Sequence, residues 1–162
     1  GLLADRLLHR LSASHMASAF LPKAVGAARL HAAMALASVQ GLVLFSSVAS
    51  TAGNVGQANY AAANAGLDAL ARGRVACGLA ASSLQLPLVG GAGMGQATMD
   101  SMRNGDAWSL GLEQYAACLG SVLHSCGAVR APLPLLPAQI GLAVHPSVGA
   151  LALLGELTAS VQ

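Results

Sequence analysis

No Asp, Glu, Lys or Arg occurs between Arg29 and Asp68, and this long uncharged stretch limits how the chain can fold. A membrane-spanning helix needs about 20 consecutive apolar residues, but polar side chains interrupt the stretch from Gln40 onward. Its purely apolar part, residues 41–45, is far shorter. Such a run is typical of a strand buried on both faces of a parallel sheet. The stretch therefore predicts the interior of an α/β domain and no membrane span.

Helical and strand patterns alternate along the rest of the chain. Ser12 is a suitable N-cap for a helix that bends near Pro22, and Gly78 is suited to close a later one. We predict helix-like segments over 2–11, 13–36, 57–77 and 112–124, strands over 41–45, 81–86 and 129–133, and loops or irregular structure over 46–56, 87–95 and 96–110. This order predicts an α/β fold with a parallel sheet of about three strands and flanking helices.

The composition narrows the classes of function. Only 9% of the residues are charged and 55% are hydrophobic, whereas soluble domains average about 25% charged residues. Either the composition has drifted towards Ala, Gly and Leu, or much of the surface contacts other protein. The net charge of +2 is scattered, so nucleic-acid binding is not expected.

The cysteines and the first residues bear on compartment and cofactors. Three cysteines lack metal-ligand spacing, which predicts buried, reduced thiols in a cytoplasmic protein and no metal site. No secretory signal is visible at the start. Because the sequence opens without Met in a helix-like pattern, we expect a segment of a longer polypeptide.

Polar side chains gather just after the predicted strand over 41–45. Ser47 lies at its carboxyl end, the edge at which open α/β sheets bind ligands. Tyr60 and Asn64 are four positions apart on the next helix and share one face. Each also has an ordinary explanation, since Ser47 suits a loop and Tyr60 suits a core. Asn64 is unfavourable inside an Ala-rich helix, which favours a functional reason for it.

These residues resemble the short-chain dehydrogenase/reductase superfamily, and within it the ketoreductase (KR) domains of type I modular polyketide synthases and fatty-acid synthases. Ordinary members carry Tyr-x-x-x-Lys, whereas this chain has Tyr60-Ala-Ala-Ala-Asn64. The synthase ketoreductases share that departure and place the lysine upstream. Here Lys23 lies 24 residues before Ser47, within Leu-Pro-Lys-Ala-Val-Gly-Ala. Phe-Ser-Ser and Gly-Gln-Ala-Asn-Tyr complete the resemblance, which covers 1–138 and is densest over 20–95.

The resemblance implies four catalytic residues, Lys23, Ser47, Tyr60 and Asn64. Tyr60 would give a proton to a ketone oxygen while a nicotinamide gives hydride to the carbon. An unperturbed tyrosine has a pKa of about 10, and a nearby cation such as Lys23 favours the phenolate, which tunes the acid. Lys23 would also bind the nicotinamide ribose. Ser47 would stabilise charge on the substrate oxygen, and Asn64 would orient Lys23 and order a proton-relay water.

The resemblance also implies a cofactor, partners and domain limits. The cofactor would be NADPH, bound through Lys23, Phe45, Ser46, Tyr60 and Pro87. The substrate would be a β-ketoacyl thioester on an acyl carrier protein. Residues 1–138 would form the carboxy-terminal, catalytic half of a Rossmann-like doubly wound sheet, and 139–162 a linker. The superfamily's phosphate-binding glycine loop would lie upstream, so we expect an upstream half and other synthase domains as partners, and little activity from this chain alone.

Two segments depart from the family pattern. Residues 90–95 are glycine-rich, but Gln96 stands where a dinucleotide fingerprint needs its last glycine. The resemblance makes this segment a lid over the nicotinamide and substrate. Relatives show Trp-Gly-x-Trp before it, whereas this chain has Leu-Pro-Leu-Val over 86–89, so its substrate contacts are expected to differ.

The family resemblance also bears on the stereochemistry of the product and on alternative functions. Ala52 replaces the tryptophan that marks one ketoreductase class, and Leu3-Ala-Asp5 partly matches the Leu-Asp-Asp of the other, which favours a D-configured hydroxyl. A non-catalytic ketoreductase remnant or scaffold is the alternative that low charge and Leu-Pro-Leu-Val support. A free-standing short-chain dehydrogenase is disfavoured by Tyr-x-x-x-Asn.

Overall fold

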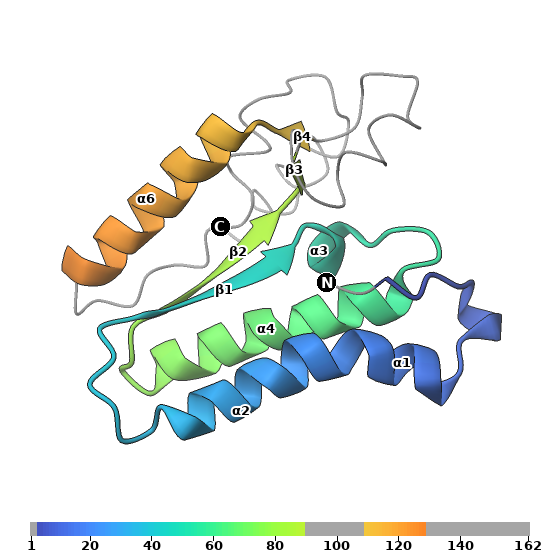
Figure 1. Ribbon diagram of the computed structural model, residues 1–162, viewed down its shortest axis with the longest axis horizontal. Helices are drawn as coiled ribbons and strands as arrows, with labels where there is room; N and C mark the ends of the chain where they lie inside the picture. Colours follow the sequence, from blue (N-terminus) through green and yellow to red (C-terminus); the bar gives the residue numbers. More distant parts are fainter. Residues whose placement is uncertain (1–2, 90–108, 129–162) are drawn as a thin grey trace, which may run out of the picture.

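The computed structural model of the protein describes residues 3–89 and 109–128 (Figure 1). Its elements in chain order are η1 (Leu8–Arg10), α1 (Ala13–Phe20), η2 (Leu21–Val25), α2 (Gly26–Ala33), β1 (Leu42–Ser47), α3 (Ala49–Ala52), α4 (Ala58–Ala76), β2 (Ala81–Leu86), β3 (Leu88–Val89), β4 (Ser109–Leu110) and α6 (Leu112–Ala128). The predicted strand over 129–133, the glycine-rich segment 90–95 and the predicted linker 139–162 lie outside the described residues.

Strands β1 and β2 are parallel, with register from Leu42 opposite Ala81 to Ser47 opposite Leu86. Helix α4 connects them across one face, and the α1–η2–α2 segment packs along α4 (Figure 1). Helix α6 lies on the other face. The predicted α/β order and parallel pairing are therefore confirmed for these elements. Because both strands run the same way, their carboxyl ends meet at one edge of the sheet.

The core has one part on each face of the sheet, as side-chain alternation along a strand requires. On the α4 face, Leu42 and Leu44 pack with Leu67, Ala71 and Ala81. On the α6 face, Leu84 packs with Val122. The uncharged stretch thus supplies β1. Its Leu42 and Leu44 are buried on the α4 face, but Val43 is only partly buried and Phe45 is 43% exposed, so the expectation of a strand buried on both faces is confirmed for the α4 face only.

The first long helix differs from the prediction. It was expected to run over 13–36 with a bend, but α1 passes through one π-helical turn, η2, into α2, which ends at Ala33. Pro22 has no N–H to donate, and the Gly26 N–H donates to the Leu21 carbonyl across the widened turn. Ser12 is confirmed as the N-cap, since its hydroxyl accepts from the His15 N–H in a capping box.

Several short segments correct the sequence expectations. Among the described residues of the segment predicted over 2–11, only Leu8–Arg10 is helical. The Arg6 N–H donates to the Gly56 carbonyl at 2.8 Å and holds the segment before η1 as a loop. The predicted loop 46–56 begins with the end of β1 and contains α3. The segments 87–95 and 96–110 were expected to be irregular, but they contain β3 and β4, which pair in parallel.

The described residues also test the expectations about cysteines, membrane spans and metal sites. Cys118 is buried as expected, but Cys77 is exposed because it follows the last turn of α4, which corrects the expectation of buried thiols. Within the described ranges, no helix is long and apolar enough to cross a membrane. Over the same residues, no group of three His, Cys, Asp or Glu side chains is placed to hold a metal ion.

Candidate active site

The predicted site residues come from three elements that meet at the carboxyl end of β1. Lys23 belongs to η2, Phe45, Ser46 and Ser47 end β1, and Tyr60 and Asn64 lie in the first two turns of α4. The return of the chain from β1 through α3 starts α4 beside the same sheet edge (Figure 1). The chain topology therefore gathers residues that are far apart in sequence.

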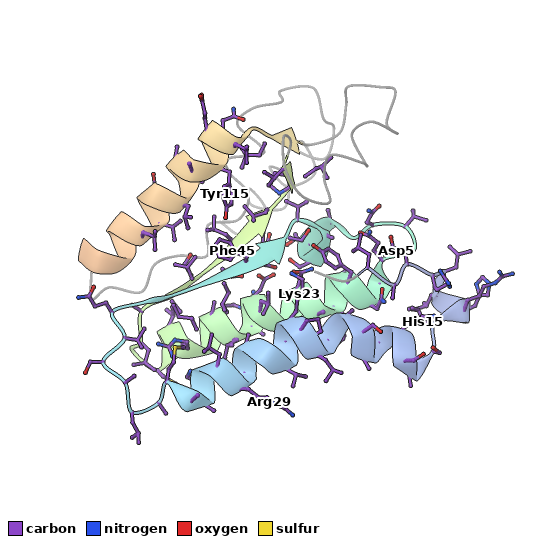
Figure 2. All side chains as sticks on the ribbon, viewed as in Figure 1. Asp5, His15, Lys23, Arg29, Phe45 and Tyr115 are labelled. Atoms are coloured by element: carbon purple, nitrogen blue, oxygen red, sulfur yellow. The ribbon has the colours of Figure 1, made fainter. Side chains whose placement is uncertain are left out.

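Lys23 is the centre of this arrangement. Its Nζ donates to Asn64 Oδ1 at 2.9 Å and to the Phe45 carbonyl at 3.4 Å, and it lies 5.3 Å from the centroid of the Tyr60 ring. Figure 2 shows Lys23 in the layer between the helices and the sheet, whereas Arg29 points away from the sheet. Burial lowers the pKa of Lys23, because desolvation disfavours the charged amine.

The contacts of Asn64 show how an asparagine on this helix can hold a lysine that comes from another element. Its side chain is fully buried. Its Oδ1 accepts from Lys23, and its Nδ2 donates to the Tyr60 carbonyl at 2.9 Å. Both ends of the carboxamide are thus used, which fixes its orientation towards the ammonium. The backbone carbonyl of Asn64 also accepts from the Ser46 hydroxyl at 3.2 Å, joining α4 to β1.

Ser47 is brought to the same edge without a direct hydrogen bond to Tyr60 among the described residues. Its side chain is 9% exposed. Its Oγ accepts from the Ala49 N–H at 3.2 Å, which leaves the hydroxyl hydrogen available to donate elsewhere. Successive strand side chains alternate in direction, so Ser46 turns to α4 and Ser47 does not.

Phe45 and Pro87 are placed differently from the four predicted catalytic residues. The ring of Phe45 lies on the α6 face of the sheet, 6.4 Å from the ring of Tyr115, and only its carbonyl contacts Lys23 (Figure 2). Pro87 follows β2 directly. The Val48 N–H donates to the Leu86 carbonyl at 3.1 Å and so joins the turn after Ser47 to the segment with Pro87.

Close helix packing lets Lys23 reach Asn64. A Cβ added at Gly66 of α4 would lie 2.9 Å from the Ala24 Cβ, closer than carbon atoms approach in proteins. Gly66 therefore sets the distance between α4 and η2, the element that carries Lys23.

We expect Gly66→Ala to destabilise the fold by about 1–3 kcal/mol through overpacking and to displace Lys23 from Asn64. Gly73→Ala on the same helix is the matched control, because nothing lies within 4 Å of an added Cβ there. It should stabilise by up to about 1 kcal/mol through helix propensity. Thermal unfolding of both variants measures the difference. Equal melting temperatures would show that an added Cβ at Gly66 fits beside Ala24 without overpacking.

The segment before η1 is tied to the start of α4. The fully buried Asn59 donates from Nδ2 to the carbonyls of Ala4 and His15, each at 3.1 Å. Gln57 Nε2 donates to Asp5 Oδ2 at 2.9 Å. The Leu-Ala-Asp segment that bears on stereochemistry thus lies beside the helix of Tyr60. The D configuration itself stays a prediction.

Comparison with known proteins decides the family. The family model for the KR domain matches residues 1–91, more than half of the chain. The chain belongs to the KR domain family. Its likeness to the Spectinabilin polyketide synthase system protein NorB of Streptomyces orinoci is 37% identity over 138 residues, 82% of this chain and 6% of that protein. With 6-methylsalicylic acid synthase of Aspergillus niger it shares 41% identity over 102 residues, 63% of this chain and 6% of that one.

Solved ketoreductases share the fold of this KR domain. The first ketoreductase of the tylosin polyketide synthase superposes with a TM-score of 0.66 at 37% identity, over 78% of this chain and 28% of that one. An A-type ketoreductase from a modular polyketide synthase gives a TM-score of 0.71 at 33% identity, over 78% and 27%. The fold is therefore the Rossmann-like α/β fold that the resemblance implied. The chain spans only these fractions of its relatives, and its assignment to the carboxy-terminal half stays a prediction.

Sequence reasoning missed Asp68, a buried carboxylate on α4 of the KR domain. It is 3% exposed and accepts from Ser83 Oγ at 2.6 Å, Ser50 Oγ at 2.7 Å and Gln85 Nε2 at 2.8 Å. Burial alone would raise the pKa of Asp68, but hydrogen bonds from Ser83, Ser50, Gln85 and Ser46 outweigh it, so the pKa lies below its usual value. A signal was present, because Asp68 is eight positions after Tyr60 and shares its helix face.

The lowered pKa of Asp68 predicts acid-labile stability. A depressed folded-state pKa contributes stability that is complete above the unfolded value, 3.8, and is lost as pH falls through the folded value. Asp68→Asn removes this titration and should cost about 1–3 kcal/mol at neutral pH. Melting temperatures from pH 7 downward should converge for the two proteins below that unfolded value. A gap that stays constant would show that Asp68 does not titrate in this way.

Proposed function

We propose that this KR domain catalyses the NADPH-dependent reduction of a β-ketoacyl thioester, carried on an acyl carrier protein, to the β-hydroxyacyl thioester. Family membership supports a ketoreductase role in polyketide synthesis. The observation that carries the proposal is the 2.9 Å hydrogen bond from Lys23 Nζ to Asn64, with the ammonium 5.3 Å from the centroid of the Tyr60 ring.

The residues divide the work of carbonyl reduction. The Tyr60 hydroxyl donates the proton that the reduced oxygen needs, and Lys23 places a positive charge beside the ring that loses it. The Ser47 hydroxyl, whose own oxygen is held by the Ala49 N–H, donates to the substrate oxygen and stabilises its developing charge. Asn64 holds Lys23 in place, and a water that reaches this site would return the proton to the Tyr60 oxygen.

The chemistry at Lys23 fits a nicotinamide cofactor. An ammonium group has three N–H donors, and Asn64 Oδ1 and the Phe45 carbonyl accept two of them. The third has no acceptor among the described residues and suits a ribose hydroxyl. NADPH supplies a hydride when it is bound. Phe45, Ser46, Tyr60 and Pro87 complete the proposed cofactor contacts at the same sheet edge.

Other parts of the synthase belong to the proposal. The chain spans 28% of the tylosin ketoreductase, so we infer that a nucleotide-binding half holds the rest of NADPH. The acyl carrier protein would deliver the substrate, and a cytoplasmic location is part of the proposal. The limits 1–138 for the catalytic half and 139–162 for the linker belong to it as well.

A non-catalytic scaffold is the second candidate. Its support is the low charge, 9% of residues, and the Leu-Pro-Leu-Val sequence over 86–89, part of which forms β3. The half-buried Lys23 argues against a scaffold, because desolvation of its amine is a cost that a purely structural segment avoids with an apolar side chain. Cofactor binding separates the two candidates.

The test joins this chain to the nucleotide-binding half of a ketoreductase such as the tylosin domain. NADPH binding is followed by cofactor fluorescence. Turnover is followed by NADPH oxidation with a β-ketoacyl thioester, both free and on an acyl carrier protein, and chiral chromatography identifies the product. We expect NADPH to be preferred over NADH and the carrier-bound substrate over the free one. If NADPH binds but turnover does not exceed that of Tyr60→Phe, the proposal of an enzyme is overturned. If NADPH does not bind, the scaffold is favoured.

A further inference from the structure

We propose that Asp68 and Ser50 are positioning residues for the Ser47 hydroxyl, with the Asp68 carboxylate fixing Ser50 and Ser50 fixing the turn that carries Ser47. This inference rests on the proposed function, because it assigns the role through the hydroxyl that would meet the substrate. The proposed reduction uses no carboxylate, so the buried Asp68 needs its own explanation.

A continuous chain of contacts leads from Asp68 to Ser47. Ser50 Oγ lies 2.7 Å from Asp68 Oδ2 and 2.8 Å from the Ser47 carbonyl oxygen. Gln85 Nε2 donates to both Ser50 Oγ, at 2.9 Å, and Asp68 Oδ2, at 2.8 Å. A hydroxyl has one hydrogen, so Ser50 shares it between two acceptors and is held where they meet. The Ala49 N–H, one residue away, holds the Ser47 hydroxyl oxygen.

Helix α4 carries both Asp68, where this chain of contacts begins, and Tyr60, the proposed proton donor. Tyr60, Asn64 and Asp68 follow one another at intervals of four residues and share one face. At 1.5 Å per residue, Asp68 is about 12 Å along the axis from Tyr60. One rigid helix therefore carries the proton donor, the residue that orients Lys23 and the carboxylate that anchors the turn of Ser47.

A second side chain of α3, that of Thr51, strengthens the anchor. Thr51 Oγ1 donates to Gln85 Oε1 at 3.0 Å, so consecutive side chains of α3 both reach the group that surrounds Asp68. Burying a carboxylate is costly unless donors surround it. If Asp68 only joined α4 to β2, the Ser83 hydroxyl on Oδ1 would serve that purpose. On Oδ2, Gln85 also comes from β2, but Ser50 comes from the turn that follows β1 and accepts from Gln85 as well.

The chain offers a matched control for the test. Ser83→Ala removes a buried hydroxyl that donates to the same carboxylate at 2.6 Å, but Ser83 is in β2 and has no hydrogen bond to the turn of Ser47. Ser50→Ala removes a hydroxyl that donates to the same carboxylate and also touches the Ser47 carbonyl. A general loss of stability affects both variants, whereas loss of positioning affects only Ser50→Ala.

The experiment uses the complete ketoreductase formed by joining this chain to a nucleotide-binding half. Small misplacements of a reacting group can cost about a hundredfold, so Ser50→Ala should lower kcat by about tenfold with the KM for NADPH unchanged, and Ser83→Ala should leave kcat within about twofold. In a Ser47→Ala background, Ser50→Ala should add less than about twofold, because coupled residues are not additive. Equal losses in Ser50→Ala and Ser83→Ala, or full additivity with Ser47→Ala, would overturn the inference.

Amide hydrogen exchange tests the inference apart from turnover. The Ala49 N–H donates to Ser47 Oγ, so it should exchange faster in Ser50→Ala and Asp68→Asn than in Ser83→Ala at equal distance from the melting temperature. If the wild-type protein does not turn over, the proposed function fails, yet this pattern would still support the positioning. Unchanged exchange at Ala49 in both variants would overturn it even in an active enzyme.

Discussion

Replacing Tyr60 with Phe is expected to lower kcat by about 10² to 10⁴, the range that general acid catalysis contributes. The substitution removes only the phenolic hydroxyl. The ring remains beside Lys23, whose Nζ lies 5.3 Å from its centroid, and the Tyr60 carbonyl still accepts from Asn64. The site should therefore keep its shape, and NADPH binding should weaken far less than turnover. Stopped-flow turnover and cofactor fluorescence, measured on the complete domain, check both halves of this expectation.

Tyr115→Phe is the matched control. Tyr115 lies in α6, with its ring 6.4 Å from the ring of Phe45 on the other face of the sheet. Loss of its hydroxyl should change turnover by less than about twofold. If Tyr60→Phe retains wild-type turnover, or if both variants lose it equally, Tyr60 is not the proton donor.

Replacing Lys23 with Met should abolish most activity while the melting temperature falls only slightly. Methionine keeps much of the chain length but removes the hydrogen bonds to Asn64 Oδ1 and the Phe45 carbonyl, and with them the charge beside Tyr60. A hydrogen bond to a charged group is worth about 1.5–3 kcal/mol, so we expect kcat/KM to fall by at least about a hundredfold. Stability should change less than activity, because relief of the desolvation of the amine partly offsets the loss of its hydrogen bonds to Asn64 and Phe45.

Arg29→Met is the matched control, because it tests whether removing any positive charge from this segment lowers activity. Arg29 lies in α2 and points away from the sheet (Figure 2). Its removal lowers the net charge by the same amount and should leave kcat/KM and the melting temperature unchanged within error. Equal losses of activity in the two variants would mean that Lys23 acts through general charge instead of its place beside Tyr60.

Most of the site could be predicted, because its residues follow fixed positions in local sequence. The four-residue spacing of Tyr60 and Asn64 guarantees a shared helix face, and the apolar run before Ser47 identifies a buried strand with a ligand-binding end. Lys23 could not be placed from spacing alone. Only its resemblance to the upstream lysine of the synthase ketoreductases suggested a partner, and the contact with Asn64 joins residues 41 positions apart.

The residues that prediction missed are those whose partners come from distant elements. Asp68 entered the sequence analysis only as the end of the uncharged stretch, yet donors from α3 and β2 surround it. Gly66 was not singled out, yet Ala24 leaves no room for a larger residue there. The π-helical turn at Pro22 and the fully buried Asn59 are further examples. In each case the local pattern allowed several structures, and packing selected one.

The sequence by itself determined the alternation of helices and parallel strands, the buried strand before Ser47 and the family of the chain. These features depend on hydrophobic periodicity and on spacing within single elements, which act over a few residues. The tertiary structure alone decided how Lys23, Asn64 and Tyr60 meet and why Asp68 is buried. Those outcomes depend on how closely separate elements approach, which side-chain volume and hydrogen bonding between elements set once the chain is folded.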